Sequence, residues 1–110
     1  DKDKQAHHIS IYHGSTLTAT ARLLPLGASY IDYASIGRVA TSVSARNRGI
    51  GKELMRYAMQ SMAILYPRVP IKISAQAYLQ KFYEGYNFIA HGDTYLEDDI
   101  PHIAMLYYYS

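Results

Sequence analysis

One long amphipathic stretch constrains the fold of this chain more than any other feature. Apolar residues recur through it at the spacing of a single helix face, and Pro67 ends the pattern. A helix with one apolar face must bury that face, and most of the other segments are strand-like, so we expect the helix to pack on a sheet. The apolar positions are Ile50, Leu54, Tyr57, Ala58, Met62 and Leu65.

The remaining segments predict strands and one further helix. Gly37 indicates a bulge or a close backbone approach within one strand, and Asn87 is suited to a left-handed residue after the second helix. The order of elements indicates an α+β fold, in which helices pack on a mixed sheet. We expect strands at 7–13, 16–24, 30–41, 70–75, 88–95 and 102–109, the long helix from Gly49, and a second helix at 77–86.

Composition excludes several classes of protein. The 110 residues suffice for one domain over residues 1–110, and 49% hydrophobic with 18% charged residues excludes a disordered polar chain. The absence of cysteine excludes disulfides, thiolate zinc sites and a cysteine nucleophile. No apolar run approaches the roughly 18 residues of a membrane span, so we expect a cytoplasmic protein. Because Asp1 is not methionine, we expect the natural chain to extend further at its N-terminus.

Charge and histidine spacing favour a small anionic ligand over a metal or a nucleic acid. The net charge of +2 is too small to indicate nucleic-acid binding by itself. His7 and His8 are adjacent in a predicted strand and therefore point to opposite faces. With no paired histidines at helical spacing, we expect no metal site.

The segment RNRGIGK, at the start of the long helix, indicates a phosphate site. The first amides of a helix lack internal partners and carry the positive end of the helix dipole. Gly49 and Gly51 let a phosphate approach the backbone, and Arg46, Arg48 and Lys52 add positive charge. The alternative is an ordinary strand-to-helix turn with solvated cations. The glycine spacing matches neither the P-loop nor the three-glycine dinucleotide motif.

Arg-x-x-Gly-x-Gly, after a strand and opening a long helix, resembles the acetyl-CoA pyrophosphate loop of the GNAT superfamily of N-acyltransferases. The segment QAYLQKFYEGYNF is similar to a second GNAT segment, Asn-x-x-Ala-x-x-Leu-Tyr-x-x-x-Gly-Phe. Three further pieces look more narrowly like the ElaA-like branch, namely Ile36–Val39, Ala75–Ala77 with Phe82-Tyr83, and residues 97–103. The resemblance covers nearly the whole chain, with Asn47, Gln76 and Asn87 departing from the usual glycine, asparagine and glycine.

This resemblance implies a three-layer GNAT-like fold with a central mixed, mostly antiparallel sheet and flanking helices. It further implies a first strand followed by helices, which we expect to precede Asp1 in the natural chain. It also implies transfer of an acetyl group from acetyl-CoA to a primary amine by direct attack in a ternary complex. The strand ending at residues 39–41 would diverge from the one at 71–75 and hold the pantetheine arm. The residues implied to bind acetyl-CoA are Val39, Ala40, Thr41, Arg46, Asn47, Arg48, Gly49, Ile50, Gly51, Lys52 and Gln76.

The resemblance also implies catalytic residues. Tyr83 occupies the position of the general acid that protonates the coenzyme A thiolate, although 12 tyrosines make the residue type itself uninformative. Glu97 and His102 are candidates for the base or for attracting a cationic amine, against a structural role or a relay through water. We expect Asp98 and Asp99 to form a solvated turn.

Several alternatives stay open on sequence alone. Arg38 suits either an acceptor carboxylate or a structural salt bridge. The chain is also compatible with a non-catalytic acyl-CoA-binding module, or with an anion- or RNA-binding domain, although its cations concentrate at one helix start. The tyrosines at 107–109 fit an edge strand that pairs in a homodimer or a buried last strand. The acceptor is open among polyamines, amino sugars, small amines, peptide N-termini and lysine.

Overall fold

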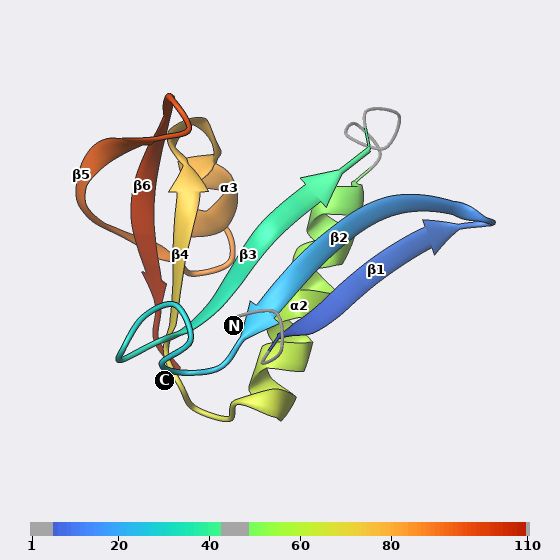
Figure 1. Cartoon of the computed structure of the whole chain (residues 1–110), viewed down its shortest axis with the longest axis horizontal. Helices are drawn as coiled ribbons and strands as arrows, with labels where there is room; N and C mark the ends of the chain where they lie inside the picture. The colour runs from blue at the N-terminus through green and yellow to red at the C-terminus, as the bar shows by residue number, and fades with distance from the viewer. Residues whose placement is uncertain (1–5, 43–48, 110) are drawn as a thin grey trace.

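The computed structural model describes residues 6–42 and 49–109 of the chain. Six strands form one sheet in the order β1-β2-β3-β4-β6-β5, in which β3 and β4 are parallel and all other neighbours are antiparallel (Figure 1). This confirms the predicted α+β class with a mixed, mostly antiparallel sheet. The elements are β1 (His7–His13), β2 (Thr16–Leu24), β3 (Ala34–Thr41), α2 (Ile50–Leu65), β4 (Ile71–Gln76), the 3-10 helix η2 (Ala77–Leu79), α3 (Gln80–Glu84), β5 (Ile89–Glu97) and β6 (Ile100–Tyr107).

One hydrophobic core lies between the sheet and the two helices. The side chains of Leu54 and Met62 on α2 are fully buried in it, together with Ile71 of β4. The helices also meet each other, because the hydroxyl of Tyr86 just after α3 donates to the carbonyl of Lys52 in α2 at 3.2 Å. Of the three expected layers, the described residues supply the sheet and one helical layer.

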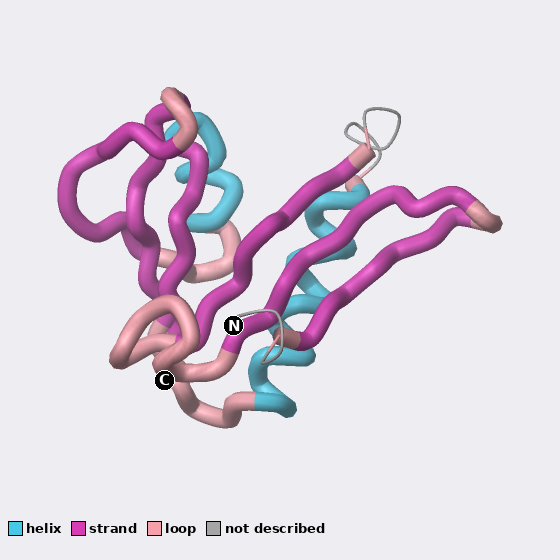
Figure 2. The backbone as a smooth tube through the Cα atoms, viewed as in Figure 1, coloured by secondary structure: helices cyan, strands magenta, loops and turns pink. Residues whose placement is uncertain are grey.

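The parallel strands β3 and β4 pair only at their beginnings. Ala34 is opposite Ile71 and Ser35 is opposite Lys72, and the pairing ends there. The sheet therefore divides into two halves, β1 to β3 with α2 and β4 to β6 with α3 (Figure 2). The expected divergence of these two strands is confirmed, and it opens the middle of the sheet.

A bulge in β3 accompanies this divergence. Thr20 of β2 is opposite Ala40, whereas Arg22 is opposite Gly37, so one residue of β2 faces two residues of β3. The bulge predicted from Gly37 is present, but the left-handed backbone is found at the next residue, Arg38, with φ of 50°. A bulge bends its strand and increases its twist. Here it turns the end of β3 away from β4.

The predicted strand at 30–41 begins four residues too early. Residues 30–33 form a turn that a bridge between Tyr30 and Tyr33 closes. Their rings pack on other elements instead of alternating across a sheet. The ammonium of Lys72 lies 4.7 Å from the centre of the Tyr30 ring, and the Tyr33 hydroxyl lies 3.0 Å from that of Tyr108. Tertiary aromatic contacts, which a local pattern does not reveal, caused this error.

The last two strands are also offset from their predicted ranges. β5 runs to Glu97, so Glu97 lies on a strand and not in a loop. Only Asp98 and Asp99 remain as the turn, with φ of 52° and 61°, the left-handed conformation of a two-residue hairpin. Because β6 lies between β4 and β5, the last strand is an inner strand of the sheet, which agrees with the second of the two alternatives for residues 107–109. Pro101 is tolerated because it lies beyond the last residue of β6 that pairs with β4.

The helices start and end close to their predicted residues. α2 begins after Gly49, whose φ of 73° is left-handed, and ends one residue before Tyr66. The predicted second helix is shorter than expected and starts as a 3-10 turn. Asn87 has the expected left-handed backbone, with φ of 71°. Neither helix in residues 6–42 and 49–109 combines the length and the hydrophobicity needed to cross a membrane.

Candidate active site

The gap between β3 and β4 is a cleft of about 710 Å³. Its walls come from both halves of the sheet and from both helices. Along β4, Ile73 and Ala75 are buried toward the core, whereas the alternating Ser74 bonds to side chains of the opposite face. Side chains from both faces of the sheet therefore line the cleft. It is lined by residues 36–41, Gly51, Met55, residues 73–76, Tyr78, Leu79, Phe82, Tyr83, Glu97, Asp98, Ile100 and His102.

Most described residues implied to bind acetyl-CoA reach this cleft. Three do not. Ile50 is buried in the core, Lys52 lines a separate open pocket of about 610 Å³ between α2 and Tyr86, and Gly49 stands just before α2. Arg46, Asn47 and Arg48 lie outside the described residues. The residues that line the cleft are Val39, Ala40, Thr41, Gly51 and Gln76.

The start of α2 is suited to an anion. The N-cap residue of α2 is Gly49, which has no side chain to cap the first amides of the helix. The Gly49 carbonyl accepts the amide of Glu53 at 3.1 Å, which begins the helical pattern. An uncapped helix start offers its free amides and its dipole to a negative group.

Tyr83 lies at the wall of the cleft with 7% of its surface exposed. Its ring packs edge-on against Phe82 and Phe88, with centroids 5.2 and 6.1 Å apart. Burial raises the pKa of the Tyr83 phenol, and the nearby Tyr78 phenol raises it further. Tyr83 therefore keeps its proton at neutral pH and can donate it.

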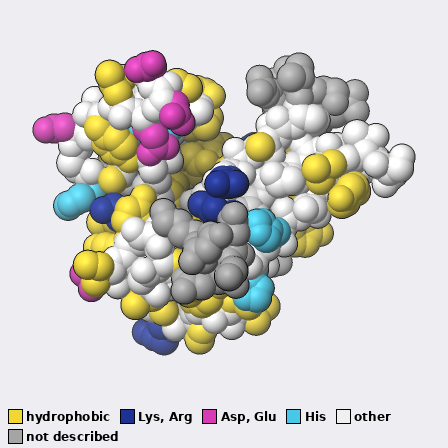
Figure 3. All heavy atoms as spheres, viewed as in Figure 1, with side chains coloured by type: hydrophobic (Ala, Val, Ile, Leu, Met, Phe, Trp, Pro, Cys, Tyr) yellow, Lys and Arg dark blue, Asp and Glu magenta, His cyan; other side chains and the backbone are white. Residues whose placement is uncertain are grey.

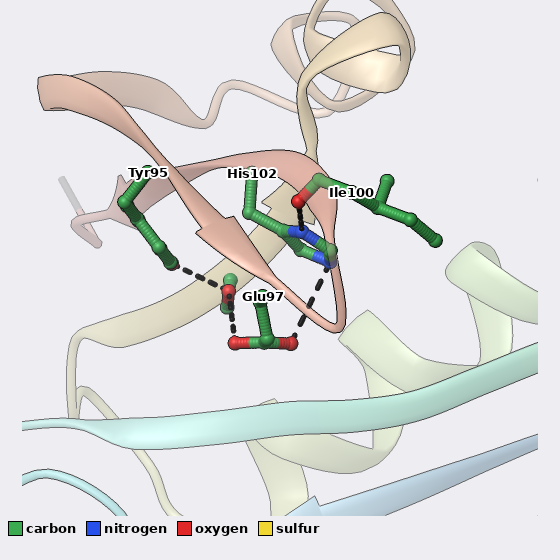
Figure 4. A network of polar contacts seen from close by, with 5 residues as sticks. Tyr95, Glu97, Ile100 and His102 are labelled. Atoms are coloured by element: carbon green, nitrogen blue, oxygen red, sulfur yellow. Dashed lines mark hydrogen bonds and ion pairs between the residues drawn. The ribbon is translucent and has the colours of Figure 1, made fainter.

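A polar network lies at the other side of the cleft (Figure 4). Glu97 Oε2 is 3.5 Å from His102 Nε2, and Glu97 Oε1 accepts a hydrogen bond of 3.1 Å from the hydroxyl of Ser74. The same hydroxyl lies 2.5 Å from that of Tyr95. His102 is buried, whereas 52% of the Glu97 side chain is exposed.

The geometry of His102 fixes where its proton lies. Nδ1 is 2.7 Å from the carbonyl oxygen of Ile100, and a carbonyl only accepts, so Nδ1 carries the hydrogen. In the neutral ring, the lone pair of Nε2 then faces the carboxylate of Glu97. A proton on Nε2 makes this 3.5 Å contact an ion pair. A ring nitrogen without a hydrogen therefore faces a carboxylate in the lining of the cleft.

Sequence reasoning did not single out Ser74 or Tyr95. Ser74 alternates with the buried Ile73 and Ala75 along β4, so its side chain points away from the core. A polar residue at such a position in the middle of the sheet is a signal that the sequence does carry. Tyr95 carries no such signal among 12 tyrosines. Its role depends on the pairing of β5 with β6, which places it opposite His102. No group of three or more His, Asp or Glu residues in the described part of the chain could hold a metal ion.

Residues 3–108 match the family described as the acetyltransferase (GNAT) domain. The chain belongs to the GNAT acetyltransferase family. It is 36% identical over 98 residues to the ElaA protein of Escherichia coli K12, a match that covers 89% of this chain and 63% of ElaA. The chain thus spans less than two thirds of that relative. The resemblance to the ElaA-like branch of the GNAT family is confirmed.

Solved GNAT structures share the fold. The crystal structure of an acyl-CoA N-acyltransferase from Pseudomonas aeruginosa has a TM-score of 0.85 at 41% identity, over 93% of this chain and 68% of that one. E. coli ElaA itself has a TM-score of 0.84 at 33% identity, with the same coverage of 93% and 68%. A GNAT family acetyltransferase from Elizabethkingia anophelis with acetyl-CoA bound has a TM-score of 0.77 at 14% identity, over 98% and 79%.

Proposed function

We propose that this chain carries the catalytic site of an acetyl-CoA-dependent N-acetyltransferase that acetylates a primary amine. The observation that carries the proposal is the cleft between β3 and β4, which brings together five of the implied acetyl-CoA residues, Tyr83 and the Glu97–His102 pair. Membership of the GNAT family supports this activity. The fold shared with the Elizabethkingia anophelis acetyltransferase, whose structure contains acetyl-CoA, supports the choice of acetyl-CoA as cosubstrate.

The end of β3 would hold the pantetheine arm. Beyond Ser35, β3 has no pairing with β4, while its other edge pairs with β2 as far as Thr41. The backbone groups of Val39, Ala40 and Thr41 that face the cleft are therefore open to hydrogen bonds. The amides at the start of α2, with Gly49 and Gly51, would bind the pyrophosphate.

Acid and base act on opposite sides of the transferred group. Acetyl-CoA, when bound, supplies an activated acetyl group. The Glu97–His102 pair takes a proton from the ammonium of the acceptor, which frees the nitrogen lone pair for attack on the thioester carbonyl. The C–N bond forms and the C–S bond breaks, and the Tyr83 phenol gives its proton to the leaving sulfur. The nitrogen loses two protons in all. One passes to solvent through the Glu97–His102 pair, and the other replaces the proton that Tyr83 gave to the sulfur.

Calorimetric titration with acetyl-CoA, with ATP as the control anion, tests the binding half of the proposal. We expect saturable binding of acetyl-CoA that is much tighter than that of ATP. A thiol reagent would then measure coenzyme A release with a panel of polyamines, amino sugars, amino acids and lysine peptides. Binding without release for every amine would identify a non-catalytic acyl-CoA-binding module. Equal binding of ATP and acetyl-CoA would identify a general anion site.

A further inference from the structure

The two walls of the cleft carry opposite charges. Among the described residues that line it, Arg38 of β3 is the only Lys or Arg, and Glu97 and Asp98 are the only acidic residues. Figure 3 shows acidic side chains gathered over the half of the molecule that contains β5 and β6, with Lys and Arg side chains nearer the middle of the same face. In Figure 4 the Glu97 carboxylate lies on the side of the polar network that faces β3.

Arg38 is exposed and free to bind a ligand. The structure gives it no hydrogen bond, ion pair or ring contact with any residue in 6–42 or 49–109, and the salt bridge considered from the sequence is not found among those residues. Lys72, by contrast, is held over the rings of Tyr30 and Tyr33, with its ammonium 4.7 and 5.9 Å from their centres. Lys72 also does not line the cleft.

The backbone of Arg38 is a second sign of function. Its φ of 50° is left-handed, a conformation that an L residue adopts at a cost, whereas the adjacent Gly37 has an ordinary φ. An arginine therefore occupies the strained position of the bulge while a glycine stands beside it. Strained residues of this kind cluster at binding and catalytic sites.

We propose that the acceptor is a zwitterion of the amino-acid class, with its carboxylate bound by Arg38 and its ammonium by Glu97. This inference rests on the proposed N-acetyltransferase function. A guanidinium binds a planar carboxylate through two parallel hydrogen bonds, which a lysine cannot match. The ammonium then lies against the Glu97–His102 pair that removes its proton. The reaction forms the C–N bond of an N-acetyl amino acid and releases coenzyme A.

The test compares matched acceptors that differ only in the carboxylate. Each set consists of an L-amino acid, its carboxamide and the amine that lacks the carboxyl group, and coenzyme A release is measured for sets with apolar, polar and charged side chains. We expect kcat/KM for the preferred amino acid to exceed that for its carboxamide at least about tenfold. The amine of the carboxamide is less basic, so a larger fraction of it is unprotonated and ready to attack at neutral pH. A preference for the amino acid therefore cannot come from amine basicity.

Arg38→Asn removes the charge at a residue type that tolerates left-handed backbone. We expect it to raise KM for the amino acid about 10- to 100-fold, to leave KM for acetyl-CoA unchanged and to abolish the preference over the carboxamide. Arg68→Asn is the matched control, because Arg68 also has a left-handed φ, of 63°, and lies outside the cleft. Arg38→Lys, which keeps the charge, should recover part of the affinity.

The outcomes distinguish a failure of the zwitterion proposal from a failure of the proposed acetyltransferase function. Release of coenzyme A at equal rates with amino acid, carboxamide and amine would overturn the zwitterion proposal and leave the acetyltransferase proposal standing. A rise in KM for acetyl-CoA instead of the acceptor in Arg38→Asn would assign the arginine to the cosubstrate and overturn the inference. Absence of release with every acceptor, despite acetyl-CoA binding, would overturn both.

Discussion

The carboxylate of Glu97 and the imidazole of His102 face each other across the hairpin that joins β5 to β6, with Oε2 3.5 Å from Nε2. The stacked ring of Tyr95, 6.2 Å away at an angle of 27°, and the carbonyl of Ile100 hold the imidazole in place. The hairpin therefore fixes both the position and the tautomer of His102. Its open nitrogen is directed at a carboxylate that the hydroxyl of Ser74 also orients.

Glu97→Gln should slow acetyl transfer without weakening acetyl-CoA binding. A neutral amide at position 97 cannot take a proton as a carboxylate can, so the proposed base would be lost. General-base catalysis typically contributes about 10²- to 10⁴-fold, and we expect kcat to fall within that range. Coenzyme A release measures kcat, and calorimetry measures the affinity for acetyl-CoA.

Asp99→Asn is the control for the charge change at Glu97. Asp99 lies in the turn just after Glu97 and does not line the cleft, and asparagine suits its left-handed backbone. Its kcat should stay near that of the wild type. If Glu97→Gln kept full kcat as well, the base would have to be a water chain or another group.

The sequence predicted the fold well where local pattern and tertiary structure agree. The helix at 50–65, the break at Pro67 and the left-handed Asn87 depend on steric and helical rules within a few residues, and all three were found. The apolar face of the helix was predicted in part, because Tyr57 and Leu65 are exposed and Met55 is buried instead. The start of β3 was predicted too early because Tyr30 and Tyr33 look like strand residues in the sequence. In the structure they instead contact Lys72 and Tyr108 from a turn. Such contacts join residues far apart in the chain.

The candidate site also has parts that local sequence predicts and parts that depend on tertiary structure. The proposed phosphate site at the start of α2 is a local feature, so its glycines were identified directly from the sequence. The polar network needs the register of three strands, which places Tyr95 opposite His102 and Ser74 two residues along β4 from Gln76, the residue opposite His102. Arg38 was a candidate on residue type alone, and only the bulge and the walls of the cleft distinguish a ligand-binding role from a salt bridge.

Gly51→Ala should raise stability and lower the affinity for acetyl-CoA at once. A Cβ at Gly51 would meet only the ring of Phe82 at 3.7 Å, an ordinary contact, and the backbone there is not left-handed. Alanine within a helix is favoured over glycine by about 0.5–1 kcal/mol. The same methyl group would occupy the space through which a pyrophosphate approaches the backbone.

Urea unfolding and acetyl-CoA titration measure the two effects of Gly51→Ala separately. Ser61→Ala, further along α2, is the control that raises helix propensity without touching the cleft. It should be stabilised with unchanged affinity. Gly51→Ala with unchanged affinity would show that the start of α2 is only a structural turn.

Tyr83→Phe should bind acetyl-CoA normally and turn over more slowly. The change removes only the hydroxyl, and the ring keeps its edge-on packing with Phe82 and Phe88. Loss of a general acid lowers kcat by about 10²- to 10⁴-fold. Tyr109→Phe is a matched control, because its buried hydroxyl has no hydrogen-bond partner among the described residues and lies outside the cleft. A kcat equal to that of Tyr109→Phe would remove Tyr83 from the mechanism.

The raised pKa of Tyr83 predicts how stability depends on alkaline pH. Below its ordinary value of 10.0, the phenol is protonated in both the folded and the unfolded chain, and it contributes no pH dependence. Above that value the unfolded chain loses the proton first and binds fewer protons than the folded chain. The free energy of unfolding therefore falls as pH rises, until the folded phenol itself ionises. Burial raises the pKa values of Tyr30, Tyr66 and Tyr109 in the same direction.

Urea unfolding of the wild type and Tyr83→Phe from about pH 8 to about pH 11 tests this sign. The variant has no phenol to ionise at position 83, so its free energy of unfolding should fall less steeply above about pH 10. Ile73→Val is the control, because it destabilises the buried core by about 0.5–1.5 kcal/mol without removing a tyrosine. Its deficit against the wild type should be the same at every pH. A parallel fall for wild type and Tyr83→Phe would mean that the folded protein does not retain the Tyr83 proton beyond its ordinary pKa.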